Sequence, residues 1–367
     1  MQAKPHLLVD ISSHGYGHVS QTSAVVNELV KLKPALRVTI RTTAPHEFLK
    51  TRFECDFQYI AETYDFGMKM ANAVDVQVAE SAAAYREFHA DWGKKVEREA
   101  RAMQLLKPDL LLANVPYLSL AAARLAKIRS VAMCCLNWAD IYQHYCDDDA
   151  SSQLIHEQML EAYLGADCFL KVQPAMEMQD LLNSRSIQPI ARTGRSERAK
   201  IVTHCARQSG TKTLQEEEKL VLVAMGGMEF RLPVHTWPRL PGVRWIVPKI
   251  WEVKRDDTID IDSLNLHFTD VLASCDAVIT KPGYGTFTEA AYAGVPVLYV
   301  TRRDWPEEVA LVAWLKQNNV CFEVSRASLQ TGELASVLQQ LWAQPAPIRP
   351  SGNGALEAAK YMIENYF

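Results

Sequence analysis

The sequence has no long hydrophobic run, no excess of positive charge and no Cys-x-x-Cys pair. Apolar stretches such as Leu110–Ala113 and Val221–Met225 have the length of strands, and a transmembrane helix needs about 20 apolar residues, so we expect no stable membrane insertion. The formal net charge of −4 gives no overall field that would attract nucleic acid, and no nucleic-acid partner is expected. None of the eight cysteines belongs to a Cys-x-x-Cys pair, which favours reduced, buried thiols in a cytoplasmic protein.

The chain of 367 residues exceeds the usual size of one hydrophobic core, so we expect two domains. Its first residues, MQAKPHLLVDI, contain a short apolar segment that ends in a glycine-rich turn. This pattern indicates a buried first strand and not a signal peptide.

Strand-like and helix-like stretches alternate in the first half of the chain. Short apolar runs predict strands at 6–11, 37–43, 109–115 and 130–136. Apolar side chains recur every three or four residues from Tyr85 to Leu106, which predicts one long amphipathic helix. This alternation is typical of a parallel sheet with helices on both faces.

The apolar periodicity fades at 187–215, and this segment is the best candidate for a linker. A second α/β series follows, with a strand predicted at 264–268 and a helix at 332–342. The predicted fold class is α/β, with two Rossmann-like parallel-sheet domains that face a cleft. The predicted parts are an N-terminal domain over 1–195, a C-terminal domain over 196–350 and a helix within 351–367 that packs back on the N-terminal domain. Open α/β sheets bind ligands at the carboxyl ends of their strands.

The run Lys281-Pro-Gly-Tyr-Gly-Thr286 follows a predicted strand and opens a predicted helix. Unpaired N–H groups at a helix start attract anions, and glycines let a phosphate approach the backbone. Lys281 would add a positive charge, Thr286 a hydroxyl, and Glu289 an acceptor for a ribose diol. A structural alternative stays open, in which Gly283 and Gly285 only supply positive φ while Lys281 is solvated and Glu289 complements the helix dipole.

A similar run, His14-Gly-Tyr-Gly-His18, follows the first predicted strand. An imidazole there could accept a proton from an attacking hydroxyl near neutral pH. A metal site is disfavoured, because the turn lacks helical i, i+4 placement and a third ligand, and we expect no metal. Two turn histidines bonded to backbone remain the alternative. Gly226-Gly227 makes a third flexible turn at the same edge, with an ordinary tight turn as its alternative.

The stretch Asn137-Trp138-Ala-Asp140 follows a further predicted strand and would face the same cleft. Trp138 could stack on an acceptor sugar. Asp140 could bind the acceptor's hydroxyls or orient His18. Packing of Trp138 in the core is an equally open alternative.

These features together resemble the GT-B glycosyltransferases, and within them the inverting, nucleotide-sugar-using branch that includes MurG and the UDP-glycosyltransferases. The donor motif of that branch has a basic or polar residue, a Gly, a hydroxyl residue, a Glu and a Gly-x-Pro. Here Glu289 follows Gly283 by six residues and Pro296 follows Glu289 by seven, as in the family. The resemblance implies a GT-B fold and a nucleotide-sugar donor, with uridine as the expected base.

The resemblance also implies roles for individual residues. Lys281, Gly285 and Thr286 would face the diphosphate and Glu289 the ribose, while Asp304, Glu307 and Glu308 fall near the groups that bind the donor sugar's hydroxyls. The expected donor-binding residues are Gly226, Gly227, Lys281, Gly283, Tyr284, Gly285, Thr286, Glu289, Asp304 and Glu308. The expected catalytic residues are His18 as the base, His14 as the second candidate and Asp140; the expected acceptor-binding residues are Gly15, Gly17, Asn137 and Trp138.

A further likeness covers almost the whole chain. The stretches SSHGYGHVSQ, YDFGMKMANAVDVQ, LNWADIY, RRDWPEEVAL and SGNGALEAA resemble the glycosyltransferase-like region that precedes the sugar kinase in plant arabinose kinases. Such a fused region need not be an active transferase. The related loop has a Gly and an Arg where this chain has Ser13 and Gln21, which bears on the acceptor or on activity itself if that Arg binds substrate.

The expected reaction is inverting and independent of metal and cofactor. Retaining GT-B enzymes often carry a second glutamate eight residues before the ribose glutamate, and Lys281 occupies that position here. Direct attack by an acceptor hydroxyl, deprotonated by His18, is therefore predicted. The acceptor could be a small molecule, a lipid-linked glycan or a protein. The alternatives are a non-catalytic sugar-nucleotide sensor and a nucleotide-sugar epimerase of the same fold.

Overall fold

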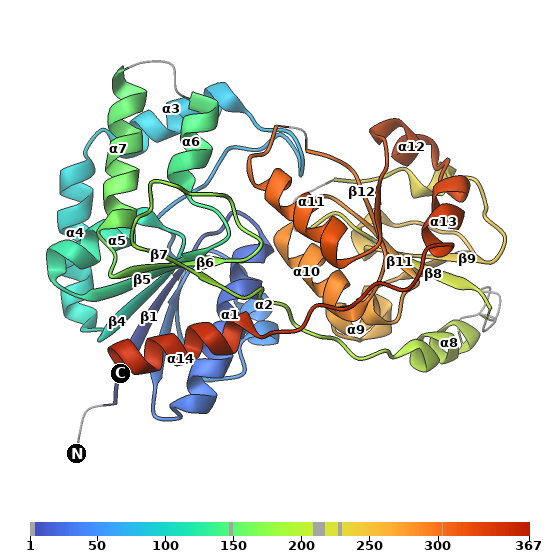
Figure 1. Cartoon of the computed structure of the whole chain (residues 1–367), viewed down its shortest axis with the longest axis horizontal. Helices are drawn as coiled ribbons and strands as arrows, with labels where there is room; N and C mark the ends of the chain where they lie inside the picture. Colours follow the sequence, from blue (N-terminus) through green and yellow to red (C-terminus); the bar gives the residue numbers. More distant parts are fainter. Residues whose placement is uncertain (1–3, 147–149, 208–216, 227–229, 303) are drawn as a thin grey trace.

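The computed structural model describes residues 4–146, 150–207, 217–226, 230–302 and 304–367. These residues form two lobes, each built around its own parallel sheet (Figure 1). Within the described ranges, every helix is too short or too polar to cross a bilayer.

The N-terminal lobe contains a seven-stranded sheet in the order β3-β2-β1-β4-β5-β6-β7, with every neighbouring pair parallel. Its strands are β1 (His6–Ile11), β2 (Arg37–Arg41), β3 (Gln58–Ile60), β4 (Leu110–Asn114), β5 (Arg129–Cys134), β6 (Cys168–Val172) and β7 (Ser184–Ile187). Its helices are α1 (Tyr16–Leu32), α2 (His46–Arg52), α3 (Val78–His89), α4 (Trp92–Leu106), α5 (Tyr117–Ala126), α6 (Trp138–Cys146) and α7 (Ala150–Leu164). Every residue of β1 and β4 is buried, which explains their continuous apolar runs.

The C-terminal lobe contains a six-stranded parallel sheet in the order β10-β9-β8-β11-β12-β13. Its strands are β8 (Lys219–Ala224), β9 (Val243–Val247), β10 (Thr258–Asp260), β11 (Ala277–Thr280), β12 (Val297–Tyr299) and β13 (Cys321–Glu323). Its helices are α8 (Arg198–Arg207), α9 (Phe268–Ala273), α10 (Tyr284–Ala293), α11 (Glu307–Asn318), α12 (Arg326–Thr331) and α13 (Ala335–Trp342). Three short 3₁₀ segments are η1 (Val234–Thr236), η2 (Lys249–Trp251) and η3 (Asp262–Leu264).

Each sheet reverses its strand order at one internal pair, β1 beside β4 in the first and β8 beside β11 in the second. At such a switch point the connections leave in opposite directions, and a crevice opens beyond the carboxyl ends of the strands. The two Gly-Tyr-Gly turns follow β1 and β11, and therefore both lie at switch points.

The chain returns to its first lobe at its end. Helix α14 (Gly354–Tyr366) packs against α1 and β7, as Figure 1 shows for the red helix beside the blue one. Arg129 donates to the Asn365 carbonyl at 2.8 Å, and the Glu357 carboxylate accepts from the backbone N–H of Gln188 at 2.9 Å. A large apolar core extends from the first sheet into α10 and α11, so the two lobes share buried surface.

Three local predictions differ from the structure. The helix expected from Tyr85 to Leu106 is two helices, α3 and α4, because the backbone leaves helical geometry at Asp91 and His89 stacks on Trp92 across the break at 4.8 Å. No strand forms at 264–268: Asn265 adopts φ +50 after η3, and Phe268 begins α9. The edge position beside β9 belongs to β10. The helix predicted at 332–342 begins later, at Ala335.

Candidate functional site

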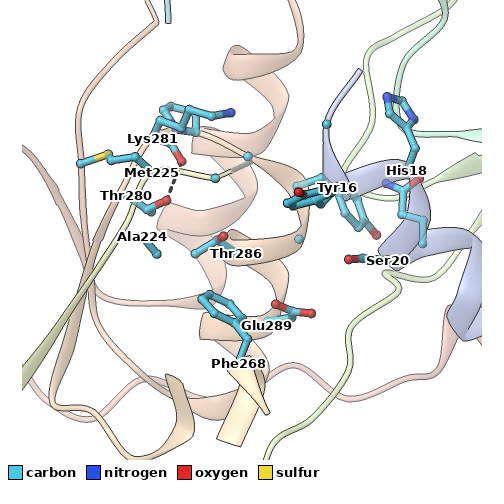
Figure 2. Close-up of a pocket in the computed structure, with 18 of the residues that line it drawn as sticks. Tyr16, His18, Ser20, Ala224, Met225, Phe268, Thr280, Lys281, Thr286 and Glu289 are labelled. Atoms are coloured by element: carbon cyan, nitrogen blue, oxygen red, sulfur yellow. Dashed lines mark hydrogen bonds between the residues drawn. The ribbon is translucent and has the colours of Figure 1, made fainter. Parts of the chain in front are cut away.

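One cavity of about 580 Å³ lies between the two lobes and is lined by residues of both. The N-terminal lobe contributes the turn from His14 to His18, and the C-terminal lobe contributes Gly226 and the turn that begins α10. Figure 2 shows Thr286 and Glu289 on α10 facing Tyr16 and Ser20 on the opposite helix. Thr286 and His18, expected to serve one site from opposite lobes, thus line a common cavity.

The start of α10 is open toward this cavity. Gly283 is its N-cap residue, and a glycine has no side chain with which to cap the helix end. The first N–H groups of a helix have no intrahelical partner, so they are available to an anion. A Cβ built on Gly285 would have no neighbour within 4 Å, which leaves room for a ligand against the backbone.

The Lys281 side chain lies against two of the glycine turns. A Cβ on Gly226 would be 3.2 Å from Lys281 Cε, and a Cβ on Gly283 would be 3.7 Å from its Nζ. Burial and the positive charge of Arg302 lower the pKa of Lys281 to about 8. A bound anion would offset both effects, so this lysine favours an anionic ligand beside the glycines.

Glu289 lies in the second turn of α10 and is 6% exposed. Burial raises the pKa of its carboxyl to about 7, against the opposing charges of Arg52 and Arg192. Within the described part of the chain, no hydrogen bond holds this carboxylate. Its oxygens are therefore available to hydroxyl groups of a ligand.

His18 stands in the first turn of α1 and is held by the neighbouring strand. Its Nδ1 is 2.9 Å from Asn114 Oδ1, so the Nδ1–H donates a hydrogen bond to this amide oxygen. The ring nitrogen that Asn114 does not hold is Nε2. The Cys134 sulfur lies 3.6 Å from the same Nδ1. Although burial opposes it, the attraction to a Cys134 thiolate raises the pKa of His18 to about 9.

His14 has a different environment. Burial, together with the charges of His18 and Arg302, lowers its pKa to about 3. Its ring lies 5.9 Å from the Trp305 ring in a stacked arrangement, and its buried Nε2 has no hydrogen-bond partner in the described chain. Gly67 permits this packing, because a Cβ there would come within 2.7 Å of the His14 ring.

Three expected acceptor-side residues do not reach the cavity. Trp138 is fully buried and donates its indole N–H to Asp65 at 2.6 Å, so it packs in the core and cannot stack on a sugar. Asn137 is also fully buried, and its side chain accepts from the backbone N–H of Asp140 at 2.8 Å. Asp140 does not orient His18, because Asn114 occupies that place. These three residues are therefore not among those that line the cavity. Gly15 and Gly17 line the cavity.

Two expected donor-side residues are also placed elsewhere. Asp304 is exposed, and its carbonyl accepts hydrogen bonds from His144 and Tyr145, so it links the lobes outside the cavity. Glu308 is buried and accepts from the backbone N–H of Arg302 at 2.6 Å. Only Glu307 of this acidic group lines the cavity.

Most of the other expected donor-binding residues line the cavity. Gly226, Lys281, Gly283, Gly285, Thr286 and Glu289 line the cavity. Tyr284 lines it too, but its hydroxyl is used structurally, accepting from Ile190 N–H and donating to the Gln173 carbonyl, both at 2.8 Å. Gly227 lies outside the described residues.

The sequence did not indicate several residues of the site. Asn114 is the last residue of β4, a strand that the sequence predicts. Its position at the carboxyl end of this strand could have indicated a place in the site. Gln21, which stands where the related loop has an Arg, accepts from Asn114 Nδ2 at 3.1 Å and donates to the Cys135 sulfur at 3.2 Å. It therefore belongs to the network that holds His18. Arg302 also lines the cavity, and only its place after β12 could have indicated it.

Among the described residues, no group of three or more His, Cys, Asp or Glu side chains is arranged to hold a metal ion. Asp262 is an acidic residue that lines the cavity, as do Ile261 and Phe268.

No protein-family model matches the sequence. The chain is 23% identical to the L-arabinokinase of Arabidopsis thaliana over 345 residues, which are 90% of this chain and 31% of that protein. It therefore spans about a third of the length of this curated relative.

Solved structures share the whole architecture. The glycotransferase of kitacinnamycin matches with a TM-score of 0.61 and 17% identity over 100% of both chains. Arabidopsis thaliana UGT89C1 complexed with UDP matches with a TM-score of 0.63 and 14% identity over 99% of this chain and 100% of the other. The chain therefore has the GT-B fold of these glycosyltransferases.

Proposed function

We propose that this protein is a glycosyltransferase that takes its sugar from a nucleotide-sugar, with a UDP-sugar expected, and transfers it to an acceptor hydroxyl with inversion. The observation that carries the proposal is the shared cavity at the two facing switch points. A lysine and an uncapped helix start form one wall, and an imidazole oriented by an amide forms the other.

On the C-terminal wall, the diphosphate would lie against the N–H groups at the start of α10 and beside Lys281. Thr286 would donate its hydroxyl, and Glu289 would accept hydrogen bonds from the ribose diol. The donor would then lie along α10, with its sugar toward the opposite lobe. The complex of the structurally similar UGT89C1 with UDP is consistent with a nucleotide donor, and the same donor is proposed here.

On the N-terminal wall, His18 would remove the proton from the acceptor hydroxyl. Asn114 supports this role, because its amide oxygen accepts from Nδ1, so Nε2 is the nitrogen that bears the lone pair once His18 is deprotonated. His14 is the second candidate and lines the same cavity. In this mechanism the growing charge on the departing diphosphate is offset by backbone N–H groups and Lys281, without a divalent ion.

A screen of nucleoside diphosphates and their sugars by isothermal titration calorimetry tests the donor. We expect a diphosphate to bind, with UDP the first choice, and the nucleotide-sugar to be cleaved when an acceptor is supplied. Release of the free diphosphate reports the reaction, and the anomeric configuration of the product reports inversion. If no nucleoside diphosphate binds the wild-type protein, the proposal is refuted.

A nucleotide-sugar sensor is the second candidate, favoured by the similarity to a region of a larger kinase. Tight binding without diphosphate release, at any acceptor tested, would favour the sensor over the enzyme. Conversion of the nucleotide-sugar into its epimer, without transfer, would favour an epimerase.

A further inference from the structure

Arg302 is a buried arginine on the loop that follows β12, and it lines the cavity. It is 6% exposed. The Glu308 carboxylate holds its backbone N–H at 2.6 Å, and its guanidinium lies over the Trp305 ring at 4.1 Å. The hydrogen bond to Glu308 fixes the Arg302 backbone, and the Trp305 ring packs on the face of the guanidinium. Together they hold the side chain in one orientation.

One edge of this guanidinium has no partner. Its Nε and Nη2 atoms are buried and lack a hydrogen bond within the described chain. The neighbouring carboxylate of Glu307 is engaged elsewhere: one oxygen accepts from the Cys135 thiol and the other from the Trp305 indole, both at 3.0 Å. A buried, charged donor pair without acceptors is costly, so a ligand that supplies two acceptors is expected.

The free edge also defines the shape of that ligand. Nε and Nη2 form the two-pronged donor face of an arginine, which matches the two oxygens of a carboxylate or phosphoryl group. A single sugar hydroxyl would accept from one of these two donors and leave the other without an acceptor. An anionic group is therefore the better complement to Arg302.

Arg302 leaves the C-terminal sheet on the strand next to that of Lys281. It follows β12, and Lys281 follows the adjacent strand β11, so the two backbones leave the sheet one strand apart, about 4.8 Å. Trp305, which stacks on Arg302, also stacks on His14 of the opposite lobe at 5.9 Å. Trp305 thus connects Arg302 with His14 on the histidine wall of the cavity, where the proposed reaction requires the transferred sugar.

We propose that the donor sugar carries a carboxylate, and that Arg302 binds it with the Nε–Nη2 edge. The preferred donor would then be a nucleoside diphosphate uronic acid. This inference rests on the proposed function, because it assigns the sugar of the same nucleotide-sugar site. A β-phosphate could offer the same pair of oxygens, and the experiment separates the two sources.

The test is calorimetry with UDP, UDP-glucose, UDP-galactose, UDP-glucuronate and UDP-galacturonate on the wild type and Arg302→Gln. We expect the wild type to bind one uronate at least about tenfold more tightly than its neutral counterpart. Arg302→Gln should lose roughly 10- to 100-fold in affinity for that uronate, the range for one paired charge contact, and stay within about twofold for UDP and the neutral sugars.

Other outcomes overturn the inference. An equal loss for UDP and for all four sugars assigns Arg302 to the phosphate. A wild type that prefers neither uronate excludes a carboxylate at this place. Both results leave the nucleotide-sugar site itself intact, whereas a wild type that binds no nucleoside diphosphate refutes the proposed function, and this inference with it.

Two further variants control for folding and for charge. Arg302→Lys keeps the positive charge but lacks the two parallel N–H donors of arginine. Its affinity for the preferred uronate alone should fall by at least about fivefold. If Arg302→Gln does not fold, this variant tests whether Arg302 binds the carboxylate. Arg326→Gln removes the same charge from the exposed pair with Asp75 and should leave all five affinities unchanged.

Discussion

The two lobes contain the same three letters, Gly-Tyr-Gly, at the same place in their folds. In each lobe the turn follows a central strand, β1 or β11, stands at the switch point of the sheet and opens a helix, α1 or α10. Both turns line the common cavity. The local sequence therefore produces the same backbone plan twice, once on each wall.

The turns differ in their flanking residues and in the use of their tyrosines. Histidines flank the first turn, while Lys281 and Thr286 flank the second. Tyr16 is 42% exposed and packs against Phe48, whereas Tyr284 is 5% exposed and bonds to the segment that joins the lobes. The Gly-Tyr-Gly turn thus has the same place on both walls, and its flanking residues distinguish the wall proposed to transfer a proton from the wall proposed to bind an anion.

Removal of the His18 imidazole is expected to have the largest effect, and it tests whether the two walls have the different roles proposed for them. We expect His18→Ala to lower kcat by about 100- to 10,000-fold, because the general base is lost, while nucleotide affinity stays within twofold. Steady-state release of the diphosphate and calorimetry measure the two quantities. His14→Ala is the matched control, and a larger loss of kcat there than in His18→Ala would transfer the base role to His14.

The reverse effect is expected on the second wall. Lys281→Ala and Glu289→Ala should each weaken nucleotide binding by about 10- to 100-fold, because each removes a charged partner of the nucleotide. Lys281→Ala should weaken UDP more than uridine, since uridine has no phosphate, whereas Glu289→Ala should weaken both. Unchanged calorimetric affinity in both variants would remove the donor from this wall.

The pH dependence of the rate sharpens the comparison further. The thiolate of Cys134 raises the pKa of His18 to about 9, so this imidazole is protonated at pH 7 and becomes a base as pH rises. We therefore expect kcat/KM to rise about tenfold per pH unit below pH 9 and then to level off. Cys134→Ala should move the midpoint to lower pH. A profile that is flat from pH 5 to 9 would favour His14, whose pKa is lowered to about 3.

The smallest expected effect separates the two tyrosines. Tyr284→Phe removes a hydroxyl that serves Ile190 and Gln173, and leaves the Ile190 N–H buried without its partner. The free energy of unfolding should fall by about 1–3 kcal/mol. Tyr16→Phe, at a half-exposed side chain, should change it by less than about 0.5 kcal/mol. Urea denaturation followed by tryptophan fluorescence compares them, and equal losses would show that the two turns are structurally equivalent.

Residues close together in the sequence were the predictable part of the site. The strand–turn–helix units around His18 and Lys281 follow from short apolar runs, glycines and helical spacing, all of which act over a few residues. The long helix across Ala90–Asp91 and the strand at 264–268 were wrong, because local periodicity does not reveal a break stabilised by His89 and Trp92 or an edge position filled by β10.

The amino-acid order alone determined the two α/β lobes, the glycine turns after their central strands and the residue types on each turn, since these depend on local conformational preference. Only the tertiary structure decided which polar groups meet: Asn114 at His18, Trp138 in the core beside Asp65, and Arg302 with a free edge in the cavity. The physical reason is that burial and partner choice depend on elements far apart in the chain, which approach only when the sheets and lobes have packed.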